Sequence, residues 1–186
     1  AENNLRRVID AEGGITENDY DRIYNRTETT DANDHTTVSE FDAVDRVIRV
    51  TDAEGQVTEF AYDAVGNRLS QTDALGRVTQ FEYDDNDRLI KQIAADTVET
   101  HFAYDSVGNR TTITRAANTA DAATDTFIYN LDDRLVSQTD AEGNTTSFVY
   151  DENHNRTVVT DPNGNATTYT YDENNRVTQI QDPEGN

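Results

Sequence analysis

The chain has 186 residues, of which 34% are hydrophobic, and its mean hydropathy is −0.86. It carries 37 acidic residues against 14 arginines and a single lysine, Lys91, so its formal net charge is −22. This balance argues against nucleic acid as a partner, because phosphate binding needs a basic surface. The low hydrophobic content argues against a thick hydrophobic core.

An aromatic residue, nearly always followed by Asp, returns at a fixed interval of 21 residues, with one longer interval. The eight anchors are Tyr20, Phe41, Tyr62, Tyr83, Tyr104, Tyr129, Tyr150 and Tyr171. A period of this length indicates a repeat array, in which each unit is stabilised by its neighbours. Because "DAEGG" at 10–14 and "DPEGN" at 182–186 both stand in mid-repeat, we expect residues 1–186 to be one array, cut from a longer chain.

Each repeat is expected to hold two strands and two turns. Thr58, Phe60 and Tyr62 alternate with polar residues, which is typical of a half-buried strand. The turn before this strand has Asp at its start and Gly where a left-handed residue is needed. These turn glycines are Gly55, Gly76, Gly143 and Gly164. We expect an all-β, continuous, twisted or spiral antiparallel strip in which the anchors form cross-strand aromatic pairs.

Arginine follows the anchors at two strictly alternating spacings. The spacing is six residues for Arg26, Arg68, Arg110 and Arg156, and five for Arg46, Arg88, Arg134 and Arg176. The structural unit is therefore about 42 residues, and we expect a bulge or a different turn in alternate hairpins. The arginines are expected to pair with the Asp after each anchor, as in Arg68 with Asp63 and Arg88 with Asp84.

One repeat, residues 104–128, carries four extra residues in an Ala-rich stretch. Insertions in repeat arrays map to loops on one face, so the segment 116–125 is predicted to be the least constrained part of the chain.

The succession Tyr-Asp, Gly-Asn-Arg or Asp-Arg, Asp-x-x-Gly and Thr-x-Phe-x-Tyr-Asp resembles the YD repeats of the RHS family across essentially the whole chain. That family includes bacterial polymorphic toxins, the shells of insecticidal toxin complexes and the teneurins. The resemblance implies a strip of hairpins that winds into a spiral, often closing as a hollow cocoon around a toxic segment. It also implies a secreted or cell-surface location.

Toxin members of the family end in an autoproteolytic region with a signature related to DPxGL. In this chain "DPNGN", beginning at Asp161, has Asn165 in place of the Leu, and the same phase recurs as an ordinary turn. We therefore assign no cleavage activity to it.

Nothing in the sequence assembles a catalytic site, so no enzyme activity, catalytic residue or cofactor is assigned. His35, His101 and His154 occupy different phases of the repeat, and no nucleophile motif accompanies them. The Asp-rich turns offer oxygen ligands, but too few each for calcium, so calcium is a weaker alternative to ordinary turn chemistry. Five N-x-T sequons are candidates for glycosylation, although this repeat would generate them by chance: Asn25, Asn109, Asn144, Asn155 and Asn165.

The sequence thus predicts a non-enzymatic, extracellular structural array, either the wall of a toxin-enclosing shell or a surface stalk or fibre. Its partners would be neighbouring repeats, other copies of itself, a toxin cargo or a cell-surface ligand. The alternative is an adhesion module that binds a glycan or a protein through its polar face or the 116–125 loop.

Overall fold

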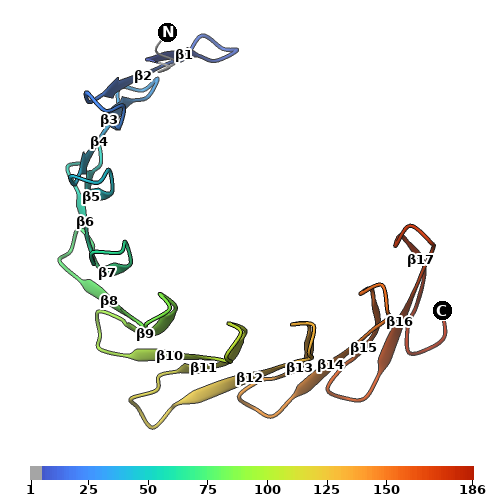
Figure 1. Cartoon of the computed structure of the whole chain (residues 1–186). Coiled ribbons are helices and arrows are strands. Elements are labelled where there is room, and N and C mark those ends of the chain that lie inside the picture. The colour runs from blue at the N-terminus through green and yellow to red at the C-terminus, as the bar shows by residue number, and fades with distance from the viewer. Residues whose placement is uncertain (1–5) are drawn as a thin grey trace. The chain divides into compact units, whose positions relative to one another are not determined.

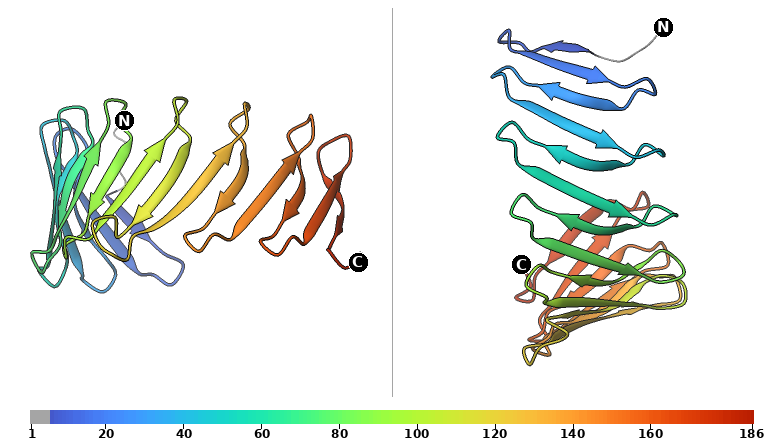
Figure 2. Two further views of the ribbon diagram at one scale, coloured as in Figure 1. Left: turned by 90° about the horizontal axis from the view of Figure 1, so that it is seen from below. Right: turned by 90° about the vertical axis from the view of Figure 1, so that its left-hand side faces the viewer.

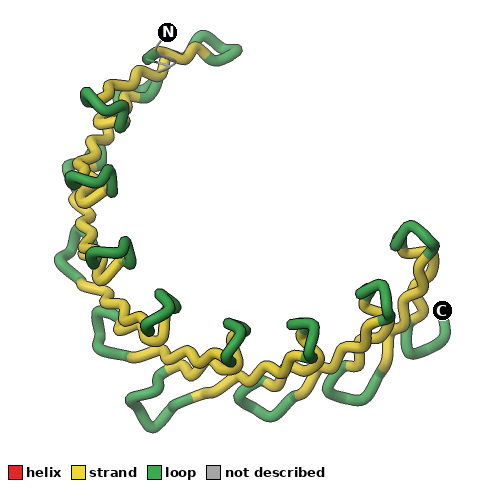
Figure 3. Tube along the Cα trace, in the orientation of Figure 1, coloured by secondary structure: helices red, strands yellow, loops and turns green. Residues whose placement is uncertain are grey.

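The computed structural model describes residues 6–186, and over this range the chain consists of strands and turns without a helix (Figures 1 and 3). The strands are β1 (Arg7–Ile9), β2 (Ile15–Tyr20), β3 (Arg26–Thr30), β4 (Thr36–Phe41), β5 (Val47–Thr51), β6 (Val57–Tyr62), β7 (Arg68–Thr72), β8 (Val78–Tyr83), β9 (Leu89–Ile93), β10 (Glu99–Tyr104), β11 (Arg110–Arg115), β12 (Ala123–Tyr129), β13 (Leu135–Thr139), β14 (Thr145–Tyr150), β15 (Arg156–Thr160), β16 (Ala166–Tyr171) and β17 (Val177–Gln181). The predicted all-β fold of tandem hairpins is confirmed.

All the described strands are antiparallel and are assigned to one open sheet. The chain divides into two compact units, Ala1–Thr97 and Val98–Asn186. Within each unit, the strands between the first and the last pair with the strand before and the strand after, as in β6 with β5 and β7. Figure 2 shows the hairpin turns alternating between the two edges of the strip. Each 21-residue repeat therefore contributes two strands and one turn at each edge.

The turns at both edges share one backbone design. In the turn that begins at Asp52, the Asp52 N–H donates to the carbonyl of Gln56 and the Gly55 N–H donates to the carbonyl of Asp52, both at 3.0 Å. The turn that begins at the anchor-following Asp84 has the same two bonds, with Asp87 in the place of the glycine. The φ angle is +77° at Gly55 and +59° at Asp87. Only the fourth residue of the turn thus needs the left-handed conformation, which explains why Gly, Asn or Asp recurs there.

The backbone register does not alternate between hairpins, and this corrects one prediction. Tyr62 pairs with Arg68 and Tyr83 pairs with Leu89, each six residues further on. The same offset and the same bulge recur at the other described anchor turns. The backbone therefore repeats every 21 residues, and only the side chains that it carries alternate with a period of about 42 residues.

The strip has no conventional hydrophobic core: among the described residues, no hydrophobic side chain is fully buried. Strand β6 shows the alternation that a half-buried strand predicts, with Glu59 and Ala61 exposed and Phe60 and Tyr62 half-buried. Because the side chains of this single-layered sheet are only partly buried, contacts between neighbouring repeats must supply much of the stability.

The expected cross-strand aromatic pairs do not form. The partner of Phe60 across the ladder is Gln71, whose own partner on the other side is Thr79. Since each repeat contributes two strands, a strand without anchors always separates two anchor-bearing strands. The aromatic rows are instead linked by arginine side chains, as described below.

The inserted segment is more constrained than predicted. Its second part belongs to a strand, because β12 begins at Ala123. Its first part is held by the Ala117 N–H, which donates to the carbonyl of Glu99, and by the Glu99 N–H, which donates to Asn118 Oδ1. Only the short stretch 119–122, between these two parts, lies outside the hydrogen-bonded strands.

Candidate functional surface

The two faces of the sheet differ in charge. In β2–β9, six strand residues are acidic, and the pairing register places all of them on the side opposite the anchors: Glu17, Asp19, Glu28, Glu40, Glu59 and Glu82. We call the side with these acidic residues the acidic face. The side that carries the anchors is called the aromatic face in both units. In β10–β17 the aromatic face carries one strand carboxylate, Asp125, whose Oδ2 lies 2.7 Å from Arg115. The acidic character of the chain thus resides in its turns and on the acidic face.

Three of the four arginines with the six-residue spacing, Arg68, Arg110 and Arg156, lie on the aromatic face between rings of successive repeats. The guanidinium carbon of Arg68 is 4.7 Å from the ring centre of Phe81 and 5.9 Å from that of Phe60. Arg110 lies 6.0 Å from Phe102 and 5.8 Å from Phe127. Arg156 lies 5.7 Å from both Phe148 and Tyr169. Each such arginine clamp holds two repeats together through cation–π contacts, which contribute about 0.5–1 kcal/mol when exposed.

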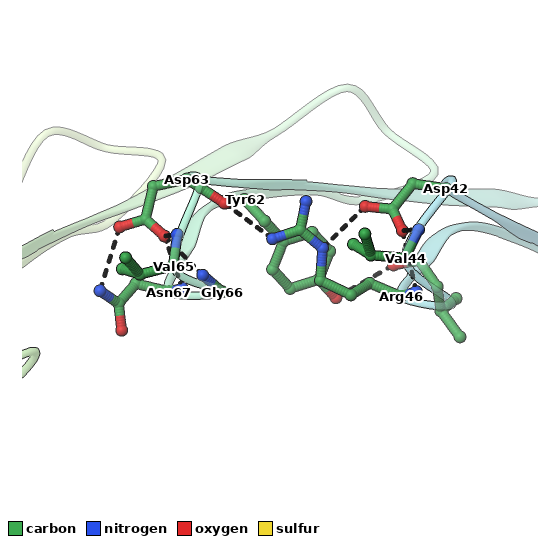
Figure 4. A network of polar contacts seen from close by, with 9 residues as sticks. Asp42, Val44, Arg46, Tyr62, Asp63, Val65, Gly66 and Asn67 are labelled. Carbon is green, nitrogen blue, oxygen red and sulfur yellow. Dashed lines mark hydrogen bonds and ion pairs between the residues drawn. The ribbon is translucent and has the colours of Figure 1, made fainter.

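Arginines with the five-residue spacing lie in the anchor turns, and Arg46 links three groups. Arg46 Nε donates to Asp42 Oδ2 at 2.7 Å and its terminal nitrogen donates to the carbonyl of Asp63 in the next anchor turn (Figure 4). Its guanidinium carbon also lies 4.8 Å from the ring centre of Tyr62. One side chain therefore closes its own turn and connects it to the following repeat.

The predicted ladder of ion pairs forms in only three of the eight anchor turns. Arg88 pairs with Asp84 at 2.7 Å, as expected, and Arg46 and Arg176 do the same with Asp42 and Asp172. The proposed pair of Arg68 with Asp63 is wrong, because Arg68 lies over the rings. Asp63 Oδ2 instead accepts a hydrogen bond from Asn67 Nδ2 at 3.0 Å.

Asparagine takes the place of the turn arginine in the alternate hairpins, and the sequence analysis missed its role. Asn67 Nδ2 also donates to Asp87 Oδ1 of the next anchor turn at 2.7 Å. The same bridge joins Asn25 to Asp45, Asn109 to Asp133 and Asn155 to Asn175. The signal was present as a strict alternation of Asp-x-x-x-Asn with Asp-x-x-x-Arg, in which Asn130 replaces the Asp once.

The anchor tyrosines join repeats through their hydroxyl groups. Tyr62 donates to the carbonyl of Val47 at 3.0 Å and Tyr83 donates to that of Arg68 at 3.1 Å, each 15 residues earlier. Tyr129, Tyr150 and Tyr171 donate to the equivalent carbonyls, those of Arg110, Leu135 and Arg156. Phe41 lacks the hydroxyl. The anchor position thus combines ring burial with a specific contact to the preceding repeat.

Hydrogen bonding lowers the pKa of Asp42 and Asp84, the aspartates that begin two of the anchor turns. The N–H groups of Arg46 and Val44 both donate to Asp42 Oδ1. The Arg46 N–H, together with the Arg46 side chain, holds the pKa of the Asp42 carboxyl below its ordinary value. At Asp84 the Arg88 side chain and then the Arg88 N–H have the same effect on the pKa. The turns are therefore built around ionised carboxylates.

The five sequon asparagines fall into two geometric groups. The side chains of Asn25, Asn109 and Asn155 each donate to the Asp of their own turn and to the following anchor turn. Asn165 Nδ2 donates to Asp161 alone. Asn144 Nδ2 lies at 2.9 Å from Asp140 and at 3.5 Å from Glu142 within the same turn. A glycan on a bridging asparagine would remove an N–H that the bridge uses.

The three histidines occupy different local settings. His35 Nδ1 lies 3.3 Å from Asp31, and His101 Nε2 lies 2.7 Å from Glu99. His154 occupies the left-handed position of its turn. Within residues 6–186 no group of three or more His, Cys, Asp or Glu side chains could hold a metal ion. A membrane-spanning helix is likewise not found in this part of the chain.

The constant turns, the alternating Arg and Asn bridges and the tyrosine contacts define a β-hairpin repeat protein. The family model described as RHS Repeat matches residues 41–78, 62–99, 83–120, 129–166 and 150–186. These segments cover more than half of the chain, and each begins at an anchor residue. The chain belongs to the RHS repeat family, and its repeats serve as a structural scaffold.

The chain also matches parts of solved structures. The chain is similar to a chain in the structure of the Photorhabdus luminescens Tc holotoxin pore, with 20% identity and a TM-score of 0.72 over 89% of this chain and 10% of that chain. It also matches a chain in the crystal structure of TcdB2-TccC3 without its hypervariable C-terminal region, at 14% identity and a TM-score of 0.27 over 92% of this chain and 16% of that chain. The first match shows a shared fold. The search of curated proteins gave no match.

Proposed function

We propose that this chain forms part of an extracellular wall, either of a toxin-enclosing shell or of a surface stalk or fibre. The observation that carries the proposal is the continuity of the bonds between repeats. Arg46 reaches the carbonyl of Asp63, and Asn67 reaches Asp87, so each anchor turn is tied to the next. A strip of this kind can be lengthened one repeat at a time without a new core.

The resemblance in fold to a chain of a Tc holotoxin pore supports the shell over the fibre. This chain spans about a tenth of that chain's length, so it would supply one segment of a much larger wall. The proposed partners are then the remaining repeats of its own polypeptide and a cargo that the wall encloses.

The proposed role needs no catalysis, and we propose that the chain is not an enzyme. The side chains of His35 and His101 each contact a single neighbouring residue, Asp31 and Glu99. Asp42 and Asp84 accept hydrogen bonds from backbone N–H groups and arginine side chains, which lower their pKa, whereas a general acid needs a raised pKa.

Electron microscopy of the full-length parent protein would test the proposal. A closed shell with density inside it would establish the toxin-enclosing wall, and filaments would establish the stalk or fibre. Isolated globules with no continuous sheet would contradict both. Fractionation of the producing cells, with a cytoplasmic marker as the control, would test the extracellular location.

A further inference from the structure

A row of aliphatic side chains follows the anchor-turn edge of the first unit. Its members are the third residues of three successive anchor turns, Ile23, Val44 and Val65, which are 61%, 66% and 74% exposed. We call these three residues the aliphatic row, and Figure 4 draws the last two. Each repeat contributes two strands about 4.8 Å apart, so neighbouring members lie about 10 Å from each other. Single exposed apolar residues are common on proteins, whereas a row along one edge indicates an interaction surface.

The turn backbone holds the aliphatic row in place. The N–H of each member donates to Oδ1 of the Asp that begins its turn, at 2.9 Å for Ile23 and at 3.0 Å for Val44 and Val65. Val and Ile side chains are also stiff, because their branched Cβ restricts χ1. A partner that covers the row therefore immobilises little that is free to move, which favours binding. The next anchor turn has Asn86 at this position, so the row ends within the first unit.

The two edges of the first unit differ in charge. The three turns that carry the aliphatic row contain four aspartates and two arginines: 21–25, 42–46 and 63–67. The three neighbouring turns at the opposite edge contain six carboxylates and no arginine or lysine: 10–14, 31–35 and 52–56. In a chain with a formal net charge of −22, two copies therefore meet less repulsion at the edge with the row than at the opposite edge.

We propose that two copies of this chain associate edge to edge through the aliphatic row. The period of the row is set by the repeat itself, so a second strip of the same repeat matches every member. A two-fold axis perpendicular to the sheet and passing beside Val44 makes the contact self-complementary. Val44 then lies against Val44 of the second copy, and Ile23 lies against Val65 of the second copy.

The shape of the strip favours this two-fold axis. The first unit is bent along its length (Figure 1). Rotation about an axis perpendicular to the sheet gives both copies the same bend, so their edges stay together, whereas a copy with its faces exchanged would bend away. Three side chains from each copy bury less than the roughly 1,200 Å² of a stable interface, so the association is weak and reversible. The proposal does not depend on whether the chain serves in a shell, a stalk or a fibre.

Disulfide trapping in the 186-residue chain tests the contact, because the sequence contains no cysteine and a single introduced one reports a single position. Under mild oxidation with copper phenanthroline, we expect Val44→Cys to form linked dimers at least 10-fold faster than Leu75→Cys. Leu75 is the matched control: it is 76% exposed, and its turn 73–77 has the same Asp, Ala and Arg as 42–46 but lies at the opposite edge. Added salt should speed the Val44→Cys reaction, because it screens the repulsion between the copies.

A mixing experiment tests the orientation of the two copies. Ile23→Cys mixed with Val65→Cys should give mainly the mixed dimer, identified by mass spectrometry, because identical positions lie about 19 Å apart across the axis. In the Val44→Cys chain, adding Ile23→Asp/Val65→Asp should slow dimer formation at least 10-fold, whereas adding Leu75→Asp should not. Circular dichroism would confirm that each variant is folded.

Three outcomes would overturn the proposal. The first is the absence of Val44→Cys dimers, or their formation at the rate of Leu75→Cys dimers, because exposure alone would then govern the reaction. The second is an Ile23→Cys dimer that forms as fast as the mixed dimer, which would exclude the antiparallel arrangement. The third is an unchanged rate in the Val44→Cys chain that carries both aspartates, because the aliphatic row would then not hold the copies together.

Discussion

The hydroxyl of Tyr62 donates a hydrogen bond to the carbonyl oxygen of Val47, 3.0 Å away and on the preceding repeat. The Tyr62 ring also lies 4.8 Å from the guanidinium carbon of Arg46. One aromatic side chain therefore contacts the preceding repeat at two points. This relationship explains why Tyr, with its polar end, is the usual anchor in a sheet that has no deep core.

Removing the Tyr62 hydroxyl should weaken the contact between repeats. We expect Tyr62→Phe to lower the free energy of unfolding by about 0.5–1.5 kcal/mol, because the Val47 carbonyl loses its side-chain donor while the ring remains. Urea denaturation followed by circular dichroism would measure the change. The reverse variant, Phe41→Tyr, places a hydroxyl opposite the carbonyl of Arg26 and should stabilise the chain by a similar amount. Destabilisation by both variants would contradict the assigned role.

The sequence was sufficient to predict the strands, the turns and the two-strand repeat, because these depend on local alternation and on turn residues such as Asp52 and Gly55. It could not show where Arg68 points. The constant register of the bulge places Arg68 over Phe60 and Phe81, and this depends on how three consecutive strands, β6, β7 and β8, pack side by side, which the pattern within one strand does not show. The bridge from Asn67 to Asp87 was missed for the same reason.

The single anchor turn that begins with Asn offers a second test. Asn130 Oδ1 accepts the N–H groups of Asp132 and Arg134, so the turn forms, but the carboxylate is missing. As a result, Arg134 Nε is buried without a hydrogen-bond partner. We expect Asn130→Asp to supply the acceptor that Asp84 provides for Arg88, and to raise the free energy of unfolding by up to about 1 kcal/mol.

The measurement for Asn130→Asp is the urea midpoint at pH 7, compared with that of Asn130→Asp/Arg134→Gln. The gain should disappear in the double variant, because it depends on the guanidinium. A gain that persists without Arg134 would show that the ion pair is not its cause.

The left-handed turn position predicts opposite effects for two substitutions. Gly76 has φ of +75°, and a Cβ added there would meet nothing within 4 Å, so Gly76→Ala should cost about 1 kcal/mol of stability through the backbone alone. Thr97 occupies the equivalent position with φ of +69° despite its branched side chain. Thr97→Gly should therefore stabilise the chain by about 1 kcal/mol. Thermal unfolding of both variants would check the signs, and a loss in Thr97→Gly would refute the strain.

Acid should unfold the chain through its turns, after a range in which lowering the pH stabilises it. Between pH 7 and about pH 4, near the sequence pI of about 4.2, protonation of unpaired carboxylates reduces the repulsion that accompanies the charge of −22. Turn aspartates such as Asp42 and Asp84 stay ionised over this range because their pKa values lie below the ordinary value of about 3.9. Their contribution to stability is present above pH 3.9 and is lost as the pH falls through the lowered pKa values.

The urea midpoint measured from pH 7 to pH 2 should therefore rise to a maximum near about pH 4 and then fall steeply. Salt at pH 7 should also raise the midpoint, because it screens the same repulsion. Asp42→Asn/Asp84→Asn is the matched variant: Asn130 shows that Asn can accept the two turn N–H groups, so the fold should remain and the acid limb should become shallower. A midpoint that increases steadily down to pH 2 would show that ionised turn carboxylates do not stabilise the strip.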